Sequence, residues 1–371
     1  MCPWVTPISD FDRTPWLDLV ISRVLTGRDT VPHTEVLVVK IRFFSVFLSL
    51  CCAWLALVAR AAAADLETVT VAYSVLSGDC APLWVATEER LGAKYGLDMK
   101  IIYAGRLRPQ QLLVSGEVPF IVATGTGALT SHILASKDQV IVLTSVNKVA
   151  SSLFTRPAIK SAEQLRGKTV ATGRPGAFGD QMVRYVLRAK LGLEPDRDVK
   201  LLAVGEAALA LPALDRGIVD AASLTIPATF IARKMGFYEL AEYDKLGIVY
   251  PYNTVTTLRE TISKKPQLVE KVLKTMIAAI AIYKTDKAKS LRAVKKYMRG
   301  VDDEVLEETY RHWSSALEQV PAPALDIIKA ALDILSFTYP QAKQTDPNLI
   351  IDASIVKRIE QSGFIAALYK K

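Results

Sequence analysis

From Asp65 onward, short runs of β-branched and apolar residues alternate with longer amphipathic stretches. Apolar runs of about four to eight residues, bounded by turn residues, are typical of buried strands, whereas the longer stretches have the spacing of helices. A chain that alternates strands and helices in this way favours an α/β fold with largely parallel sheets. We therefore expect strands whose ends lead into turns that begin helices.

This alternation divides into two units and a helical end. The first unit is expected to hold strands at Val69–Val75, Leu97–Tyr103, Phe120–Ala123 and Val140–Val146. The second unit begins near Ser151 and is expected to hold strands at Thr169–Thr172, Val199–Ala203 and Ala221–Leu224. A further strand, Tyr252–Leu258, is predicted to return to the first unit, and the chain from Pro266 onward is predicted to be helical.

The two units resemble each other in sequence. Residues Leu112–Ala128 parallel Ala213–Ala228, so that Gly116 falls on Gly217 and Thr124 on Thr225 at one offset. Similarity at a fixed offset indicates two versions of one structural unit. The sequence therefore predicts two lobes of related architecture.

The N-terminus carries an export signal. The uncharged, mostly apolar run Phe43–Ala59 follows Arg42 and leads to small residues that end at Ala64. This pattern predicts a secretory signal peptide over residues 39–64 and a periplasmic location for the mature protein. An uncleaved membrane anchor is the alternative, because the run approaches the length needed to cross a bilayer. Residues 1–38 are expected to be a non-native or disordered extension.

The mature chain has few residues of the types that usually carry out catalysis. Once residues 1–64 are removed, the remaining chain contains Cys80, His132 and His312 as its only cysteine and histidine residues. No HExxH, CxxC, GxSxG or P-loop pattern occurs, and Cys80 alone cannot form an internal disulfide. We therefore expect a protein that is not an enzyme and that has neither a cofactor nor a metal site.

Charge argues against nucleic acid as a partner. The chain has 46 Lys and Arg against 38 Asp and Glu, a net charge of +8, with acids interleaved among the bases. No basic and aromatic groove pattern is visible. The densest basic run, Lys284–Arg299, is interpreted as the solvated face of a helix, with docking to a membrane partner as the alternative. The protein is expected to be a monomer.

Four turns between a strand and a helix form the candidate site. They lie at Ser77–Cys80, Thr124–Gly127, Gly173–Asp180 and Thr225–Pro227. Ligands bind beyond the carboxyl ends of strands in open α/β sheets, where free N–H groups and helix dipoles favour anions or polar groups. The alternative is that Gly, Ser and Thr are simply the residues that turns and helix caps use.

Single residues in these turns suggest particular roles. Arg174 is positioned to pair with an anionic ligand, whereas Asp79 and Asp180 are interpreted as caps of their own helices. Phe178 and Trp84 are predicted either to stack on a planar ligand or to pack in the core.

Longer segments of the chain resemble a known family, the periplasmic substrate-binding proteins of ABC transporters for nitrate, sulfonates and taurine. This family includes relatives of the thiamine-pyrimidine synthase. The resemblance covers Thr68 to about Leu368 and is carried by Ala81–Met99, Leu112–Thr124, Ile159–Gly173, Lys190–Gly205 and Ala213–Ala222. It implies the type II periplasmic-binding fold, with lobe 1 formed by residues 65–149 and 251–371, and lobe 2 by residues 150–250. Crossovers are expected near Asn147–Ser152 and Pro251–Thr256.

The resemblance also implies a function and a set of contacts. The protein is expected to capture a small anionic or polar-aromatic nutrient and to deliver it to an ABC transporter permease. The ligand contacts carried over by position are Ser77, Cys80, Thr124, Gly125, Asn147, Arg174, Gly176, Ala177, Phe178 and Thr225. The alternatives are an enzyme of pyrimidine metabolism on the same fold and a membrane-anchored sensor or partner-binding module. The synthase relatives use a cysteine-rich motif, of which only Cys80 is present here.

Overall fold

The computed structural model describes residues 66–105, 109–136, 138–205 and 207–370, and residues 66–371 form one compact unit. This unit contains two five-stranded sheets. The predicted extension, 1–38, and signal peptide, 39–64, lie outside the described residues. Within the described residues, no helix has both the length and the apolar character needed to cross a membrane.

The first sheet is built from both ends of this unit. Its strand order is β2 (Leu97–Tyr103), β1 (Glu67–Tyr73), β3 (Phe120–Ala123), β10 (Val249–Leu258) and β4 (Gln139–Lys148). Strand β1 pairs in parallel with β2 and β3, whereas β10 runs antiparallel to both β3 and β4. We call this sheet and its helices lobe 1.

The second sheet repeats the same plan. Its strand order is β7 (Lys200–Gly205), β6 (Thr169–Gly173), β8 (Ala221–Thr225), β5 (Ser151–Thr155) and β9 (Tyr238–Glu242). Strand β6 pairs in parallel with β7 and β8, and β5 runs antiparallel to β8 and β9. This sheet and its helices form lobe 2. In sheet order, each lobe therefore has three parallel strands, one reversed strand and a fifth strand that runs parallel to the first three.

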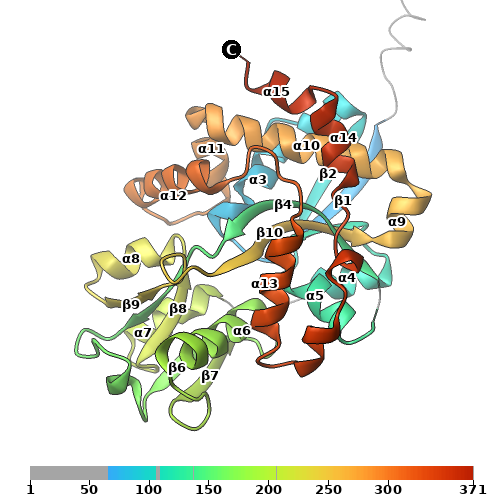
Figure 1. The fold of residues 1–371 in the computed structure, drawn as a ribbon. Helices are drawn as coiled ribbons and strands as arrows, with labels where there is room; N and C mark the ends of the chain where they lie inside the picture. The colour runs from blue at the N-terminus through green and yellow to red at the C-terminus, as the bar shows by residue number, and fades with distance from the viewer. Residues whose placement is uncertain (1–65, 106–108, 137, 206, 371) are drawn as a thin grey trace, which may run out of the picture. The chain divides into compact units, whose positions relative to one another are not determined.

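Helices cover both sheets, and the C-terminal helices add a further layer (Figure 1). Lobe 1 holds α3 (Ala81–Glu88), α4 (Pro109–Ser115) and α5 (Thr126–Ile133), and lobe 2 holds α6 (Phe178–Tyr185), α7 (Ala210–Asp215) and α8 (Ala228–Lys234). The C-terminal helices are α9 (Arg259–Lys264), α10 (Pro266–Thr285), α11 (Lys287–Tyr297), α12 (Asp303–Ala316), α13 (Leu325–Leu335), α14 (Ser354–Gln361) and α15 (Phe364–Leu368). Helices α10 and α11 pack on α3, whereas α13 contacts both β10 and α6 and so connects the two lobes.

The sequence repeat corresponds to one structural piece in each lobe. Gly116 follows α4 with a φ of 82°, and Gly217 follows α7 with a φ of 68°. This left-handed backbone costs little only for glycine, and it ends a helix before the chain turns back. Val118 and Val219, which are both buried, then lead into strands β3 and β8. The repeated segment is therefore a helix, a glycine turn and a strand in both lobes.

The structure refines several sequence expectations. Strands β2 and β3 begin and end at the predicted residues, whereas the short α8 and β9 were not predicted. The chain passes between the sheets at residues 149–150 and 243–248. The expected second crossover, Pro251–Thr256, lies within β10, where it pairs with β3 and β4.

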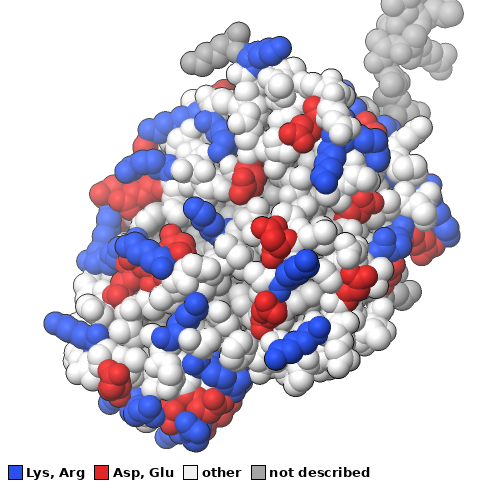
Figure 2. Space-filling model, in the orientation of Figure 1, with Lys and Arg blue, Asp and Glu red and all other residues white. Residues whose placement is uncertain are grey.

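The charged surface is mixed. Figure 2 shows Lys and Arg side chains next to Asp and Glu over the visible face. On α11, Lys295 pairs with Asp303 at 2.7 Å and Lys296 pairs with Glu88 at 2.7 Å. The predicted basic run is therefore largely neutralised by neighbouring acids.

Candidate ligand cleft

The four predicted turns converge on one cavity. Each turn follows a strand: β1 leads to the short helix η1 (Gly78–Cys80), β3 to α5, β6 to α6 and β8 to α8. The cavity has a volume of about 980 Å³ and is lined by residues of both lobes and of the C-terminal helices. The carboxyl ends of the parallel strands thus face a shared space, as open α/β sheets lead one to expect.

Seven predicted contact residues lie in the cavity wall. They are Ser77 and Thr124 in lobe 1 and Arg174, Gly176, Ala177, Phe178 and Thr225 in lobe 2. The wall therefore combines hydroxyl groups, a guanidinium and an aromatic ring from two different lobes.

The other three predicted contact residues do not line this cavity. Cys80 is 1% exposed, and its Sγ lies 3.8 Å from Asn253 Nδ2. The Gly125 N–H donates to the Pro251 carbonyl over 2.8 Å, and Asn147 Nδ2 donates to Glu318 over 3.4 Å. These residues are turned toward protein partners, which sequence position alone does not indicate.

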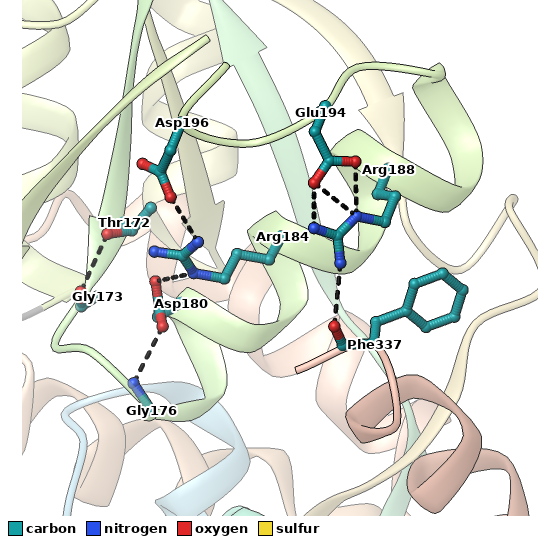
Figure 3. Close-up of polar contacts among 9 residues, drawn as sticks. All are labelled: Thr172, Gly173, Gly176, Asp180, Arg184, Arg188, Glu194, Asp196 and Phe337. Atoms are coloured by element: carbon teal, nitrogen blue, oxygen red, sulfur yellow. Dashed lines mark hydrogen bonds and ion pairs between the residues drawn. The ribbon is translucent and has the colours of Figure 1, made fainter. Parts of the chain in front are cut away.

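The glycine-rich turn before α6 is held by an ion-pair network (Figure 3). Gly176 has a φ of 77°, and its N–H donates to Asp180 Oδ2 over 3.0 Å. Arg184 Nε donates to Asp180 Oδ1 over 3.0 Å and its Nη1 donates to Asp196 over 2.9 Å. The cap residue of α6 is Ala177. The prediction that Asp180 caps its own helix is therefore corrected, because its carboxylate secures the turn that precedes the helix.

Three hydrogen bonds join lobe 2 to the rest of the protein around the cleft. Ser77 Oγ donates to the Ile226 carbonyl over 2.9 Å, a buried bond between the turns that follow β1 and β8. Arg174 Nη2 donates to the Gly105 carbonyl over 3.1 Å, from the turn after β6 to the chain after β2. On the side shown in Figure 3, Arg188 donates to the Phe337 carbonyl over 3.0 Å. The two lobes therefore touch across the cleft in this conformation.

Aromatic rings form part of the wall. The Phe178 ring lies 5.2 Å from that of Tyr250 and 5.3 Å from that of Tyr252. Tyr252 also stacks on the buried Trp313 at 6.0 Å. Phe178 and Tyr252 line the cavity, whereas Trp84 is fully buried and stacks on Tyr297. Of the two predicted stacking residues, only Phe178 reaches the cavity.

Asp79 is an acidic wall residue that the sequence pattern predicted to be a helix cap. Asp79 is only 4% exposed, and its Oδ2 accepts a hydrogen bond from Asn253 Nδ2 over 2.8 Å. Burial raises the pKa of Asp79, against the opposing effect of Ser77 and Asn253. The prediction of a helix cap is corrected here as well, because Asn253 on β10, rather than the following helix, binds this carboxyl.

Cys80, His132 and His312 each contact other parts of the protein. Burial raises the pKa of the Cys80 thiol well above its usual range, and Asp79 adds to the rise, so the thiol stays protonated. His312 stacks edge-on against Trp313, and burial lowers its pKa. His132 Nε2 contacts the Gln139 carbonyl at 2.9 Å. Across the described residues, no three His, Cys, Asp or Glu residues are grouped so as to hold a metal ion.

Several wall residues escaped the sequence reasoning. Tyr103, Tyr252, Tyr297 and Tyr339 come from β2, β10, α11 and the segment after α13. None follows a glycine-rich turn, so the signal that identified the other residues is absent from them. Tyr252 was the most accessible to prediction, because it lies in a segment expected to pass beside the cleft.

Two α/β lobes of matching strand order that share one cleft define the periplasmic-binding-protein fold, which the structural relatives also have. The family model of the NMT1-like family matches residues 62–296. The chain therefore belongs to the NMT1-like family.

Solved structures confirm the fold. The alkanesulfonate-binding protein SsuA from Xanthomonas axonopodis pv. citri, bound to MOPS, has a TM-score of 0.61 and 21% identity over 80% of this chain and 98% of that chain. The periplasmic nitrate-binding protein NrtA from Synechocystis PCC 6803 has a TM-score of 0.62 and 14% identity over 83% of this chain and 92% of that chain. The desulfurization enzyme DSZB has a TM-score of 0.61 and 13% identity, covering 80% of this chain and 99% of that chain. No curated protein matches the sequence.

Proposed function

We propose that this protein is the solute-binding component of an ABC importer, which captures a small organic solute between its lobes and presents it to a permease. The observation that carries the proposal is the single cavity walled by strand-end turns from both lobes. A ligand held there contacts both lobes at once, so its binding free energy stabilises the closed arrangement over an open one. A permease that recognises the closed surface then distinguishes loaded from empty protein.

The wall chemistry supports a small polar ligand with an anionic or planar aromatic part. Arg174 supplies a fixed positive charge, and Ser77, Thr124 and Thr225 supply hydroxyl groups. The Phe178 ring offers an apolar face against which a planar group packs. We infer export to the periplasm from the signal pattern at Phe43–Ala59.

An enzymatic role is the second candidate, because one structural relative is named as a desulfurization enzyme. Nucleophilic catalysis by a cysteine requires a thiolate, and the Cys80 thiol is buried with a raised pKa. It also lies behind the cavity wall. We therefore favour binding without chemistry. Release of a new product from an aminopyrimidine or a sulfonate incubated with the protein is the result that supports the enzymatic candidate.

The proposal is tested by thermal unfolding of the exported protein against nitrate, alkyl sulfonates, taurine, aromatic carboxylates and aminopyrimidines. A ligand at 100 times its dissociation constant adds about 2.7 kcal/mol to the free energy of unfolding. For a protein of this size, that stabilisation raises the midpoint by about 4 °C. A folded protein whose midpoint responds to none of these classes contradicts the proposed function.

Arg174→Ala tests the anion-binding part of the proposal. Loss of a charge-assisted hydrogen bond is expected to weaken an anionic ligand about tenfold or more. Arg216→Ala is the matched control, because Arg216 is exposed at the end of α7 and does not line the cavity. Equal affinities for the wild type and both variants remove Arg174 from the ligand site.

A further inference from the structure

The wall of the cleft contains a buried carboxyl group of which only one oxygen has a hydrogen-bond donor. Asp79 lines the cavity and is 4% exposed. Asn253 donates to Oδ2, but Oδ1 has no hydrogen-bond partner within the described structure. A buried acceptor without a donor is costly, and proteins rarely leave one in place without a use.

Neighbouring residues hold this carboxyl in position but do not supply a hydrogen-bond donor to both of its oxygens. Ser145 Oγ donates to Asn253 Oδ1 over 2.7 Å, which orients the Asn253 amide so that its Nδ2 donates to Asp79. Gly78, the residue before Asp79, lies directly against the Trp313 indole. The turn that carries Asp79 is therefore held from two sides.

The polar groups closest to Asp79 in the wall have other partners. The Ser77 hydroxyl donates to the Ile226 carbonyl over 2.9 Å. Within the described part of the chain, no Lys or Arg is among the groups that act on the Asp79 carboxyl. Cys80 Sγ lies 4.0 Å from Asp79 Oδ2, the oxygen that Asn253 already binds. Oδ1 keeps no hydrogen-bond partner beside these groups, and Asp79 lies in the cavity wall, so a ligand in the cleft can supply a donor.

We propose that Asp79 is a specificity-determining residue that accepts a hydrogen bond from an amino or ammonium group of the ligand, so that the cleft selects an amino-bearing organic solute over a simple oxyanion. This inference rests on the proposed solute-binding function and assigns the chemistry of one end of the ligand. The rings of Phe178 and Tyr252, also in the wall, are available for the body of such a solute. A cavity of about 980 Å³ is also far larger than a lone nitrate ion needs.

The competing interpretation is that Asp79 is protonated and donates to an anion. Both interpretations place the ligand on the same carboxyl, but they predict opposite pH dependence. The titratable groups that face Asp79 are Cys80 on η1, Tyr252 on β10 and Tyr283 on α10, and burial raises the pKa of each. These three groups stay neutral at about pH 5 to 8, so they do not obscure the titration of Asp79.

The test compares ligand pairs that differ only by an amino group. Calorimetric titration of the exported protein uses 4-aminopyrimidine against pyrimidine, and taurine against ethanesulfonate. We expect the amino-bearing member of at least one pair to bind about tenfold or more tightly than its partner. Asp79→Asn is expected to abolish that preference, because the amide oxygen accepts the hydrogen bond from Asn253 and leaves the NH₂, which is only a donor, at the position of Oδ1. Asp215→Asn, an exposed acid outside the cavity, is expected to leave it unchanged.

Three outcomes overturn the inference, and they differ in whether the proposed solute-binding function is also contradicted. If ethanesulfonate binds as well as taurine and Asp79→Asn changes neither, the solute-binding function stands and the role of Asp79 fails. If ethanesulfonate binds more tightly at low pH and Asp79→Asn removes that dependence, Asp79 is a protonated donor to anions. If no probe binds the folded wild-type protein, both the inference and the proposed function fail for these classes of solute.

Discussion

The contact between Gly78 and Trp313 gives the sharpest test of how the cleft is supported. A Cβ at position 78 is placed 2.4 Å from Trp313 Cδ1 and 2.6 Å from Thr309 Cγ2, well inside van der Waals contact. Trp313 is fully buried and stacks on Tyr252, so the indole cannot move away from an added methyl group. Gly78→Ala is therefore expected to cost about 1–3 kcal/mol of overpacking.

Urea and thermal unfolding measure this cost. With a denaturant slope of about 3 kcal/mol/M, the loss lowers the urea midpoint by about 0.3–1 M. The thermal midpoint falls by about 2–5 °C. Gly179→Ala is the matched control, because its Cβ meets no atom closer than 3.6 Å and Gly179 lies in the first turn of α6. We expect the control to be neutral or slightly stabilising.

A double-mutant cycle identifies the cause. Trp313→Phe removes Nε1, which lies 2.6 Å from a Cβ at position 78, and leaves a smaller ring, so Gly78→Ala is expected to cost less in that background than in the wild type. The indole nitrogen of Trp313 has no hydrogen-bond partner within the described structure, so its removal leaves no new unpaired group. Wild-type stability for Gly78→Ala, or an equal cost in both backgrounds, refutes the reasoning.

Two further predictions concern the ion pairs of lobe 2. Arg184→Ala leaves the buried Asp180 with the Gly176 N–H as its remaining donor, so we expect a loss of about 1–2 kcal/mol and a thermal midpoint lower by about 2–3 °C. An unchanged midpoint contradicts this role. The Arg197 guanidinium, then the Glu194 N–H and Arg166, lower the pKa of Asp198 to about 2. A lowered pKa stabilises the fold above the ordinary value of 3.8, and this contribution disappears as the pH falls toward 2. The free energy of unfolding of Asp198→Asn is therefore expected to be lower than that of the wild type at neutral pH and to match it at about pH 2. Urea unfolding across that pH range measures this difference. A constant difference at every pH contradicts the assignment.

Local signals account for most of the fold that the sequence predicted. The strands β2 and β3 have clear apolar patterns and clear ends, and both were predicted with the observed bounds. The strand β9 was missed because Tyr238–Glu242 carries two acids and lies at the edge of its sheet, where burial is partial. Its identity as a strand depends on pairing with β5, which no local pattern encodes.

The same distinction applies to the cleft. Gly176 and Thr225 were found because a turn between a strand and a helix has a recognisable composition. Cys80 and Asn147 were placed among the contacts by position, yet the packing turns both toward protein partners. Whether a residue in such a turn faces the ligand depends on what packs behind it.

The sequence by itself determined the alternation of strands and helices, the doubled plan of the two lobes and the four turns that line the cleft. These features depend on neighbours along the chain, through apolar periodicity and glycine backbone preference. Only the tertiary structure decided that Asp79 meets Asn253, which lies 174 residues away in the chain, and that one carboxylate oxygen stays unpaired in the wall. Hydrogen bonds between distant residues form only when β10 returns beside β3 and β4, so no local pattern determines the chemistry of that end of the cleft.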